Sequence, residues 1–370
     1  MQTDFAFGDD LGPTKIIQLL EPTIGLCAAL VVDNVAAGPS LGGVRIAPDV
    51  TIDECRRLAR AMTFKNAAAQ LPHGGGKAVI RADPKLPREK KERLIRGLAC
   101  ALRDIKEYIL APDMGTNEEC MAWIKDEVDR VVCLPRQLGG IPLDEIGATG
   151  WGLRHAADIA AEYCDLKLDG ARVAIQGFGS VGLHAARFLA EVGAVVVAAA
   201  DTGGTTYDPD GIDVARLIDL KRDGRSVVDF GKGEKLTRDA VLFVDCDILV
   251  PAARPDGIGV DNLHRVKTRM ILQGANIPVT REAEEQLHRH GVLCVPDFIA
   301  NAGGVICAAM EYAGSTETVA VQAIEEKIRR NTKAVLEAAR TSNITPRQAA
   351  VELATQRVKK AMSYRRWSLF

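Results

Sequence analysis

The 370-residue chain lacks an excess of charge of either sign, because 47 lysine and arginine residues stand against 49 aspartate and glutamate residues. The formal net charge of -2 gives no reason to expect nucleic acid or an anionic membrane surface as the main partner. The sequence also lacks a signal-peptide pattern at its start. Its longest apolar run, Ala194 to Ala200, is far shorter than the roughly 20 residues of a membrane span. We therefore expect a cytoplasmic protein with no nucleic-acid and no membrane partner.

The sequence has no cysteine framework. Its nine cysteines are an odd number and include no C-x-x-C pair, which argues against a set of disulfides and against a structural zinc site. We expect the cysteines to be small buried apolar side chains in a reducing compartment, and we expect no metal site. Internal repeats and low-complexity linkers are missing as well, so the length predicts about two globular domains.

The first part of the chain alternates strand-like and helix-like stretches. Leu26 to Asp33 is a short apolar run typical of a strand, and Thr51 to Gln70 starts with a capping box, threonine at the N-cap and glutamate three residues later. The apolar stripe of this helix comprises Ile52, Cys55, Leu58, Ala59, Met62 and Ala69. Lys65 falls on that stripe. Either its stem packs while its ammonium reaches solvent, or it is directed inward to a ligand.

A second lysine, Lys77, follows in the segment LPHGGGKAVI, residues 71–80, where three glycines predict a turn before an apolar strand. A phosphate-binding loop is excluded. That motif needs glycine at position 71 and serine or threonine at position 78, where this chain has leucine and alanine. Two lysines directed inward from neighbouring elements instead suggest one anionic ligand.

The second half of the chain contains a dinucleotide fingerprint. A strand at 172–175 is followed by GFGSVG, then by an apolar-periodic helix, and then by the strand 194–200, which ends in Asp201. Such glycines let the backbone approach a pyrophosphate at a helix N-terminus, and the acid can accept a hydrogen bond from a ribose hydroxyl. The pattern predicts a nicotinamide dinucleotide site made by Gly177, Gly179, Ser180, Val181, Gly182 and Asp201.

Three further apolar runs of strand type suit a doubly wound parallel sheet. They are Asp245 to Pro251, Met270 to Asn276 and Val292 to Asp297. Near the end, the segment TPRQ at 345–348 is a second capping box with proline at the first helical position. The last residues should therefore form a helix.

Lys77 has the setting of a general acid or base. Desolvation by an apolar strand and the nearby cation Lys65 should lower its pKa from about 10.4 toward about 7 to 8. A nicotinamide cofactor supplies the redox chemistry, so a covalent Schiff base is unnecessary. The best carboxylate partner is Asp113, which ends the apolar run in ILAPDMGT. From local sequence, Asp113 can also be a turn residue or the cap of a helix that begins near Asn117.

Six segments of the chain, taken in order, resemble the glutamate, leucine, phenylalanine and valine dehydrogenase family. They are GPSLGGVRI, MTFKNAAAQLPHGGGKAVI, APDMGT, QGFGSVG, QGAN and PDFIANAGGVI. The similarity runs from about Leu26 to Tyr312, and the first residues and the C-terminal helices are not diagnostic. The family oxidatively deaminates L-amino acids to 2-oxo acids and ammonia with NAD(P), and it also catalyses the reverse reductive amination.

The resemblance implies a role for each matching residue. Lys65 matches the lysine that holds the substrate α-carboxylate, Lys77 the lysine that polarises the carbonyl and activates water, and Asp113 the aspartate that shuttles protons at the nitrogen. The positions near the cofactor are Thr149 and Asn276, and Asn301 falls near the junction of nicotinamide and substrate. The glycines before Lys77 would let substrate approach the backbone closely.

The pocket positions predict an apolar substrate. Glutamate enzymes of the family have a lysine that pairs with the side-chain carboxylate, and this chain has Leu41 there, which would leave that carboxylate desolvated and unpaired. The matching substrate positions are Leu41, Gly42, Lys65, Ala111, Asn301, Val305 and Ala308. We expect leucine, isoleucine, valine, methionine or phenylalanine. Glutamate is the alternative, because segments of the cofactor domain look more like those of glutamate enzymes.

The sequence thus predicts a two-domain α/β enzyme with its active site in the interdomain cleft. An N-terminal α/β substrate and oligomerisation domain (1–140) precedes a Rossmann-type doubly wound dinucleotide-binding domain (141–340), and a C-terminal helix (341–370) returns to the first. Asp201 favours NAD over NADP by repelling a 2′-phosphate, and NADP stays possible. The resemblance implies a homo-oligomer, a hexamer or an octamer. The rival of another class is a non-catalytic NAD-binding sensor or subunit.

Overall fold

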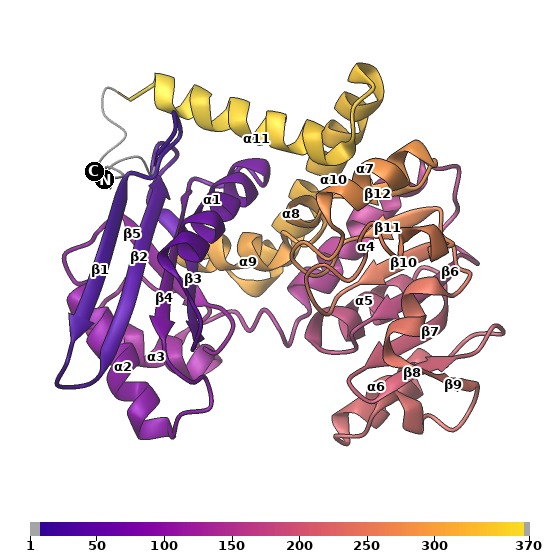
Figure 1. The fold of residues 1–370 in the computed structure, drawn as a ribbon, viewed down its shortest axis with the longest axis horizontal. Coiled ribbons are helices and arrows are strands. Elements are labelled where there is room, and N and C mark those ends of the chain that lie inside the picture. Colours follow the sequence, from indigo (N-terminus) through magenta and orange to yellow (C-terminus); the bar gives the residue numbers. More distant parts are fainter. Residues whose placement is uncertain (1–7, 366–370) are drawn as a thin grey trace. The chain divides into compact units, whose positions relative to one another are not determined.

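The computed structural model describes residues 8–365, and contacts within the chain divide it into two compact units (Figure 1). Unit 1 comprises the described residues of Met1–Pro142, Val305–Ala320 and Glu352–Phe370, and unit 2 comprises Leu143–Gly304 and Val321–Val351. The sequence predicted contiguous ranges, 141–340 and 341–370. In the structure, residues 305–320 belong to unit 1 instead, and residues 341–351 belong to unit 2. A helix that changes unit partway leaves no signal in composition.

Unit 1 is built on a five-stranded sheet with the order β1-β2-β4-β3-β5. Its strands are β1 (Lys15–Glu21), β2 (Leu26–Asn34), β3 (Ser40–Ala47), β4 (Gly74–Arg81) and β5 (Tyr108–Pro112). β1 pairs with β2, and β2 with β4, in antiparallel fashion, whereas β3 runs parallel to both β4 and β5. β2 confirms the strand that the apolar run at 26–33 predicts.

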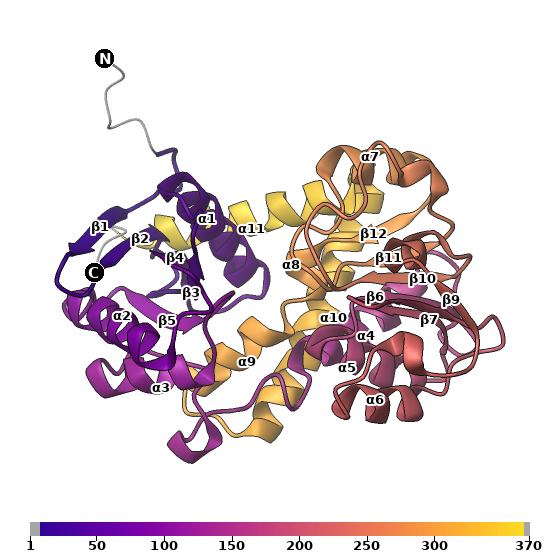
Figure 2. The same cartoon turned by 60° about the horizontal axis from the view of Figure 1, so that its bottom comes forward.

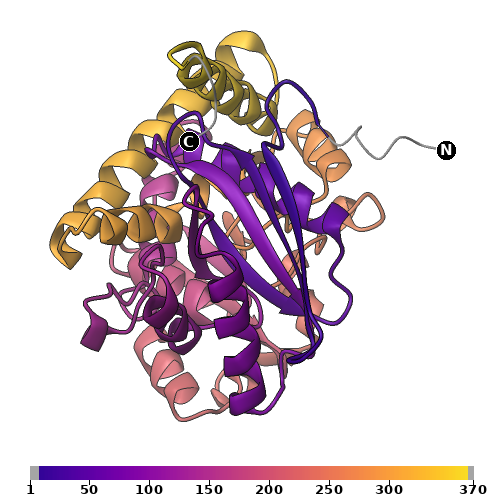
Figure 3. The same ribbon diagram turned by 90° about the vertical axis from the view of Figure 1, so that its left-hand side faces the viewer.

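Helices cover both faces of this sheet (Figures 1 and 3). They are α1 (Ile52–Ala68) on one face, and α2 (Arg88–Ala101) and α3 (Glu118–Glu127) on the other. Alternate residues of a strand point to opposite faces, so Leu30 packs toward α2 and α3 whereas Val31 packs toward α1. Lys77 is the register partner of Val31, which puts its side chain on the α1 face. The helix that bears Lys65 therefore covers the strand that bears Lys77.

The three glycines before Lys77 lie inside strand β4, so the prediction of a glycine-rich turn is wrong. They are needed because neighbouring segments pack closely against the strand. A Cβ on Gly75 would stand 2.0 Å from the backbone nitrogen of Thr63 in α1, and a Cβ on Gly74 would stand 1.6 Å from the carbonyl oxygen of Asn34 in β2. Glycine at these positions makes room for the protein's own backbone. The sequence analysis had instead expected the glycines to let substrate approach closely.

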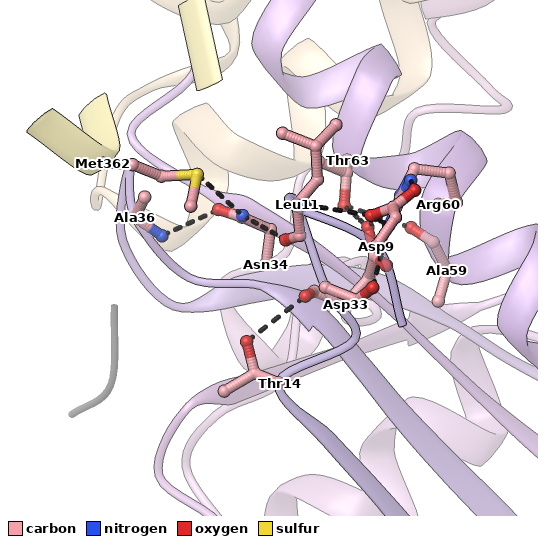
Figure 4. A network of polar contacts seen from close by, with 11 residues as sticks. Asp9, Leu11, Thr14, Asp33, Asn34, Ala36, Ala59, Arg60, Thr63 and Met362 are labelled. Atoms are coloured by element: carbon pink, nitrogen blue, oxygen red, sulfur yellow. Dashed lines mark hydrogen bonds and ion pairs between the residues drawn. The ribbon is translucent and has the colours of Figure 1, made fainter. Parts of the chain in front are cut away.

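A buried carboxylate fixes α1 to β2 (Figure 4). Asp33 in β2 is fully buried, and its Oδ2 accepts a hydrogen bond of 2.6 Å from the Thr63 hydroxyl and one of 2.8 Å from Arg60 Nε. Arg60 also donates to Asp9 through Nη1 and Nη2, at 2.6 and 2.8 Å. Because α1 carries Lys65 in its last turn, these bonds fix the helix on which that lysine is placed.

Unit 2 contains a seven-stranded sheet with the order β12-β11-β10-β6-β7-β8-β9 (Figure 2). Its strands are β6 (Arg172–Gln176), β7 (Val195–Asp201), β8 (Gly204–Tyr207), β9 (Glu234–Leu236), β10 (Ile248–Pro251), β11 (Met270–Leu272) and β12 (Leu293–Val295). Five of them run parallel, and β8 and β9 are antiparallel additions at one edge. The strands predicted in this half are confirmed, within a Rossmann-type parallel sheet.

One of the other helices in the described part of the chain, α5, begins at Ser180 inside the fingerprint. These helices are α4 (Ala148–Ala161), α5 (Ser180–Ala190), α6 (Val214–Arg222), α7 (Arg281–Arg289), α8 (Asp297–Ala300), α9 (Gly303–Tyr312), α10 (Glu317–Ser342) and α11 (Pro346–Ser363), with short 3-10 helices at Arg136–Leu138, Val227–Asp229, Arg238–Phe243 and Leu263–Arg265. Within residues 8–365, no helix combines the length and the apolar character needed to cross a membrane.

The C-terminal helix α11 begins as predicted, with Pro346 at its first position and Thr345 Oγ1 accepting from the backbone N–H of Gln348 at 3.2 Å. Within unit 2, the half-buried Arg347 pairs with the carboxylates of Glu284 and Asp297. Within unit 1, Arg357 donates to carbonyl oxygens at the C-terminal end of α1.

The cysteines are all free, and most but not all of them are buried. Burial raises the pKa of the Cys55 thiol to about 12, which makes this group inert at neutral pH. The prediction that the cysteines are buried is wrong for two of them, because Cys27 and Cys100 are exposed. Cys27 is the register partner of the exposed Leu20 at the end of the β1–β2 pair, which apolar packing does not cover.

Candidate active site

Lys77 and Asp113 form a close ion pair in unit 1. Lys77 is only 5% exposed, and its Nζ lies 2.7 Å from Oδ2 of Asp113, the residue that follows β5. Asp113 is not the cap of α3, because the Asn117 side chain accepts from the backbone N–H of Cys120 instead. A buried amine and a carboxylate at this distance can exchange a proton with each other or with a bound molecule.

Arg45 in β3 is a member of this cluster that the sequence analysis missed. Its Nε donates to the same oxygen, Asp113 Oδ2, at 2.9 Å, and its Nη1 donates to Glu54 Oε1 at 2.7 Å. Burial by itself would raise the pKa of Asp113, but the charges of Lys77 and Arg45 bring that pKa below its usual value. The residue could have been suspected from its place two positions after the GG of GPSLGGVRI.

The contact to Arg45 also corrects the capping box expected at 51–54. Thr51 Oγ1 does accept from the backbone N–H of Glu54, at 3.1 Å. The Glu54 carboxylate, however, pairs with Arg45 instead of returning to the N-cap backbone. A charged partner on an adjacent strand makes a stronger hydrogen bond than a neutral backbone N–H does, so the tertiary contact prevails.

Two glycines in β3 make room for close neighbours, Gly42 for the backbone of β4 and Gly43 for the ion pair. A Cβ on Gly42 would stand 1.8 Å from the carbonyl oxygen of Gly76, and a Cβ on Gly43 would stand 2.7 Å from Cβ of Asp113 and 3.3 Å from Nζ of Lys77. The Tyr108 hydroxyl donates to the carbonyl oxygens of both glycines, at 2.7 and 3.1 Å. Gly42 was predicted as a site residue, and Gly43 is the neighbour whose missing side chain lets the pair form.

The predicted substrate residues of unit 1 lie on the strands around the pair and on α1. Leu41, two residues before Gly43, shares its face of β3 and is 1% exposed. Ala111 is the register partner of Gly43 in β5 and is half-buried. Lys65 is half-buried in the last turn of α1. The next residue, the buried Asn66, donates to the carbonyl oxygens of Leu41 and Gly74, at 3.2 and 2.6 Å, and so ties this turn to β3 and β4.

Helix α9 contributes two more predicted substrate residues to unit 1. Val305 is half-buried and Ala308 is buried. Glu311 of the same helix accepts hydrogen bonds from the backbone N–H groups of Leu134 and Ile141, at 3.1 and 2.9 Å. Burial raises the pKa of the Glu311 carboxyl, and its hydrogen bonds attach α9 to the segment that follows α3.

The fingerprint in unit 2 has the geometry that a dinucleotide needs. Gly177 has a φ of +88°, and a Cβ on Gly182 would stand 1.8 Å from the carbonyl oxygen of Gly177, so each position requires glycine. A Cβ on Gly179 would meet no atom of the described chain within 4 Å, which leaves open space at the N-terminus of α5. Ser180 begins α5 and donates to Asp144 Oδ1 at 2.9 Å, with Val181 next in the same turn. The open position is a cradle for a pyrophosphate.

A cavity of about 570 Å³ adjoins this loop. It is lined by glycine-loop residues, by Asp201 and by charged side chains, among them Lys221, Arg238, Asp239 and Arg254. Its size and its place at the carboxyl ends of β6 and β7 suit the adenosine half of a dinucleotide. The residues present therefore fit NAD or NADP.

Asn276 and Asn301 lie together in unit 2. The Asn301 side-chain amide donates to Asn276 Oδ1 at 3.3 Å and to the carbonyl oxygens of Gly274 and Ala275, at 3.3 and 3.2 Å. Thr149 in α4 lies near the start of α9, with its Oγ1 3.2 Å from a Cβ built on Gly304. The structure thus gathers the predicted residues into two groups, one around Lys77 and Asp113 in unit 1 and one around the fingerprint and Asn301 in unit 2.

Two family models match the chain. Residues 139–366 match the model described as Glutamate/Leucine/Phenylalanine/Valine dehydrogenase, and residues 25–130 match the model described as Glu/Leu/Phe/Val dehydrogenase, dimerisation domain. The first match contains the whole fingerprint, and the second contains both members of the Lys77–Asp113 pair.

Several glutamate dehydrogenases are similar to the chain over most of its length. A glutamate dehydrogenase of Aeropyrum pernix is 40% identical over 359 residues, which cover 90% of this chain and 85% of the relative. An NADP-specific glutamate dehydrogenase of Saccharolobus shibatae is 41% identical over 295 residues, or 76% of this chain and 70% of the relative. An NAD-specific glutamate dehydrogenase of Staphylococcus aureus is 35% identical over 353 residues, or 90% of this chain and 85% of the relative.

Solved structures resemble the fold of the whole chain. A hetero-hexameric glutamate dehydrogenase of Thermus thermophilus, in a leucine-bound form, has a TM-score of 0.84 at 30% identity and covers 95% of this chain and 90% of its own. An L-tryptophan dehydrogenase of Nostoc punctiforme has a TM-score of 0.73 at 25% identity and covers 94% of this chain and 96% of its own.

Proposed function

The chain belongs to the glutamate/leucine/phenylalanine/valine dehydrogenase family, and we propose that Lys77 and Asp113 carry its reaction, the reversible oxidative deamination of an L-amino acid. As a family member it is an amino-acid dehydrogenase that uses NAD or NADP. The observation that carries the proposal is the 2.7 Å ion pair between a buried lysine and a partly buried aspartate. The turnover assay described below separates this role from that of a non-catalytic NAD-binding protein.

The two residues divide the proton transfers between them. A bound nicotinamide supplies the hydride chemistry at the substrate α-carbon. Lys77 stabilises the oxygen of the water that adds to the resulting imino carbon, and later that of the carbonyl. Asp113 carries protons to and from the nitrogen, so that ammonia leaves as the carbon–nitrogen bond breaks. Lys65 holds the α-carboxylate as its counter-ion, while Thr149 lies near the cofactor and Asn301 near the junction of nicotinamide and substrate.

The substrate supported best by the comparisons is glutamate. The relatives at 35 to 41% identity are named glutamate dehydrogenases, and they cover most of this chain. On that ground glutamate is the first substrate to test, ahead of the apolar amino acids that the sequence analysis favoured.

A second substrate class is supported by the residues of the pocket. Leu41 and Ala308 are both apolar and buried, so neither side chain can pair with a glutamate carboxylate. A branched or aromatic side chain would bury apolar surface against them at no electrostatic cost. The resemblance to a tryptophan dehydrogenase, at 25% identity, is compatible with this class.

The test is a turnover assay on the purified chain. NADH or NADPH formation is followed at alkaline pH with a panel of L-amino acids that contains glutamate, leucine, valine and phenylalanine. Activity on any of them supports the chemistry, and the ratio of kcat/KM values decides between the two substrate classes. Silence across the panel with both cofactors would favour the non-catalytic rival.

The oligomeric state is part of the same proposal. The match to a family model described as a dimerisation domain, and a structural relative titled hetero-hexameric, support an oligomer, and we propose that its subunits are copies of this chain. Sedimentation or mass photometry of the purified chain distinguishes a hexamer from an octamer or a monomer.

A further inference from the structure

The carboxylate of Asp201 already accepts four hydrogen bonds from groups of the protein. Its Oδ1 accepts from the backbone N–H of Gly203 at 2.9 Å and from the Ser226 hydroxyl at 2.7 Å. Its Oδ2 accepts from Lys221 Nζ at 2.6 Å and from the backbone N–H of Val227 at 3.0 Å. An ionised carboxylate has about four acceptor positions, so a ribose hydroxyl would have to displace one of these donors.

Lys221 also compensates the charge of Asp201. The lysine lies in the last turn of α6, its side chain is 23% exposed, and both members of the ion pair line the 570 Å³ cavity. The repulsion of a 2′-phosphate that the sequence analysis expected requires an uncompensated carboxylate. Here a 2′-phosphate near Asp201 meets an ammonium at the same place.

The rest of the cavity adds more positive than negative charge. Arg238 and Arg254 line it together with Asp239, and both arginines contact that carboxylate, at 3.4 and 3.0 Å. Their side chains are about half exposed, at 49% and 51%, so they can turn toward a ligand at little cost in burial. Counted with the Asp201–Lys221 pair, three cations face two carboxylates, which suits a phosphate more than a neutral hydroxyl.

We propose that this cavity accepts the 2′-phosphate of NADP, that Lys221 is the residue that selects for it, and that Asp201 serves to position Lys221 and the 226–229 turn. The inference rests on the proposed function only for the identity of the ligand as a nicotinamide dinucleotide. It concerns affinity for the adenosine end and needs no turnover.

The experiment is a binding titration of the full chain with NADH and NADPH, followed by nucleotide fluorescence. Adenosine 2′,5′-bisphosphate and 5′-AMP serve as competitors that lack the nicotinamide. We expect NADPH to bind within about tenfold of NADH in the wild type. Lys221→Met should weaken NADPH and the bisphosphate by about tenfold or more and leave NADH and 5′-AMP nearly unchanged.

Lys232→Met is the matched control. Lys232 also pairs with an aspartate, Asp208, at 2.7 Å, but it does not line the cavity. This variant should leave all four affinities unchanged. If Lys221→Met lowered NADH and NADPH affinity equally, or neither, the proposed selectivity would be wrong.

Asp201→Asn gives a second arm, in which the carboxylate loses its charge and Lys221 loses its counter-ion. The amide keeps a hydrogen-bond acceptor for Lys221, so NADPH affinity should rise relative to NADH affinity, and this rise should be lost in the double variant Asp201→Asn/Lys221→Met. A folded Asp201→Asn protein that lost NADH binding would show instead that Asp201 is a ribose ligand. Failure to bind either nucleotide in the wild type would count against the proposed function itself, whereas tight NADH with undetectable NADPH would overturn only this inference.

Discussion

Arg45 donates to Asp113 through Nε at 2.9 Å, and the oxygen it contacts is the one that Lys77 also contacts. The aspartate therefore faces two cations from two neighbouring strands, β3 and β4, while Glu54 of α1 shares Arg45 with it. Both cations favour the ionised carboxylate, although burial opposes it. Arg45 thereby positions Asp113 and sets the pH at which the proposed proton carrier is in its basic form.

Arg45→Met should move the acid limb of the kcat/KM profile for deamination to higher pH. With one cation gone, burial and Lys77 remain, so the pKa of Asp113 rises and the basic form is lost at a higher pH. Arg45→Lys should move the limb less. Profiles measured from pH 5 to 10 check this, and Arg57→Met, which alters an exposed pair with Asp53, is the control. An acid limb that stayed in place would remove Arg45 from this role.

Lys77→Ala should abolish turnover and leave NADH or NADPH binding nearly intact. The lysine is part of the proposed proton transfers in unit 1, whereas the nucleotide cavity is in unit 2. Steady-state rates and fluorescence titration together check this. General acid–base residues contribute about 10²- to 10⁴-fold, so a folded variant that kept even about a tenth of the wild-type rate would exclude Lys77 from the mechanism.

Leu41→Lys should raise kcat/KM for glutamate relative to leucine by about tenfold or more, because the new ammonium can pair with the side-chain carboxylate. The wild-type residue is 1% exposed, so the variant will be less stable and must be checked by thermal unfolding. Leu41→Met is the volume-conserving control and should leave the ratio unchanged. If the ratio did not move in a folded Leu41→Lys protein, residue 41 would not contact the substrate side chain.

Gly179→Ala should affect dinucleotide binding and not folding, whereas Gly182→Ala should affect folding. A methyl group at 179 meets open space among the described residues, so the variant should fold normally and lose dinucleotide affinity. A methyl group at 182 meets the Gly177 carbonyl oxygen at 1.8 Å, so the second variant should be destabilised by about 1 to 3 kcal/mol or more. Thermal unfolding and nucleotide titration of both variants check this pair. Normal affinity in Gly179→Ala would contradict the cradle.

The sequence predicted several features that depend on neighbours along the chain. Short apolar runs predicted β2, β6 and β7, the capping box with its proline predicted the start of α11, and the fingerprint predicted the turn before α5. The sequence also paired Lys77 with Asp113, because a lysine that acts as general acid or base needs a carboxylate with which to exchange protons. The roles of these residues in catalysis stay predictions, to be tested as above.

The features that the sequence could not supply depend on neighbours across strands. Glu54 looks like the end of a capping box until β3 brings Arg45 within 2.7 Å. Asp201 looks like a free ribose acceptor until α6 brings Lys221, twenty positions later, to its second oxygen. In each case local pattern gives the residue type, and packing decides which partner neutralises the charge.

Arg347→Met should lower the free energy of unfolding of unit 2 by about 3 to 5 kcal/mol. The guanidinium pairs with two carboxylates, Glu284 and Asp297, whose side chains are only 3% and 7% exposed, and its loss leaves both without their cation. Arg281→Met removes an exposed pair with Glu285 from α7 and should change stability little. Chemical denaturation at pH 7 checks both variants. A loss of stability in Arg347→Met no larger than that in Arg281→Met would mean that the buried pair contributes little to the fold.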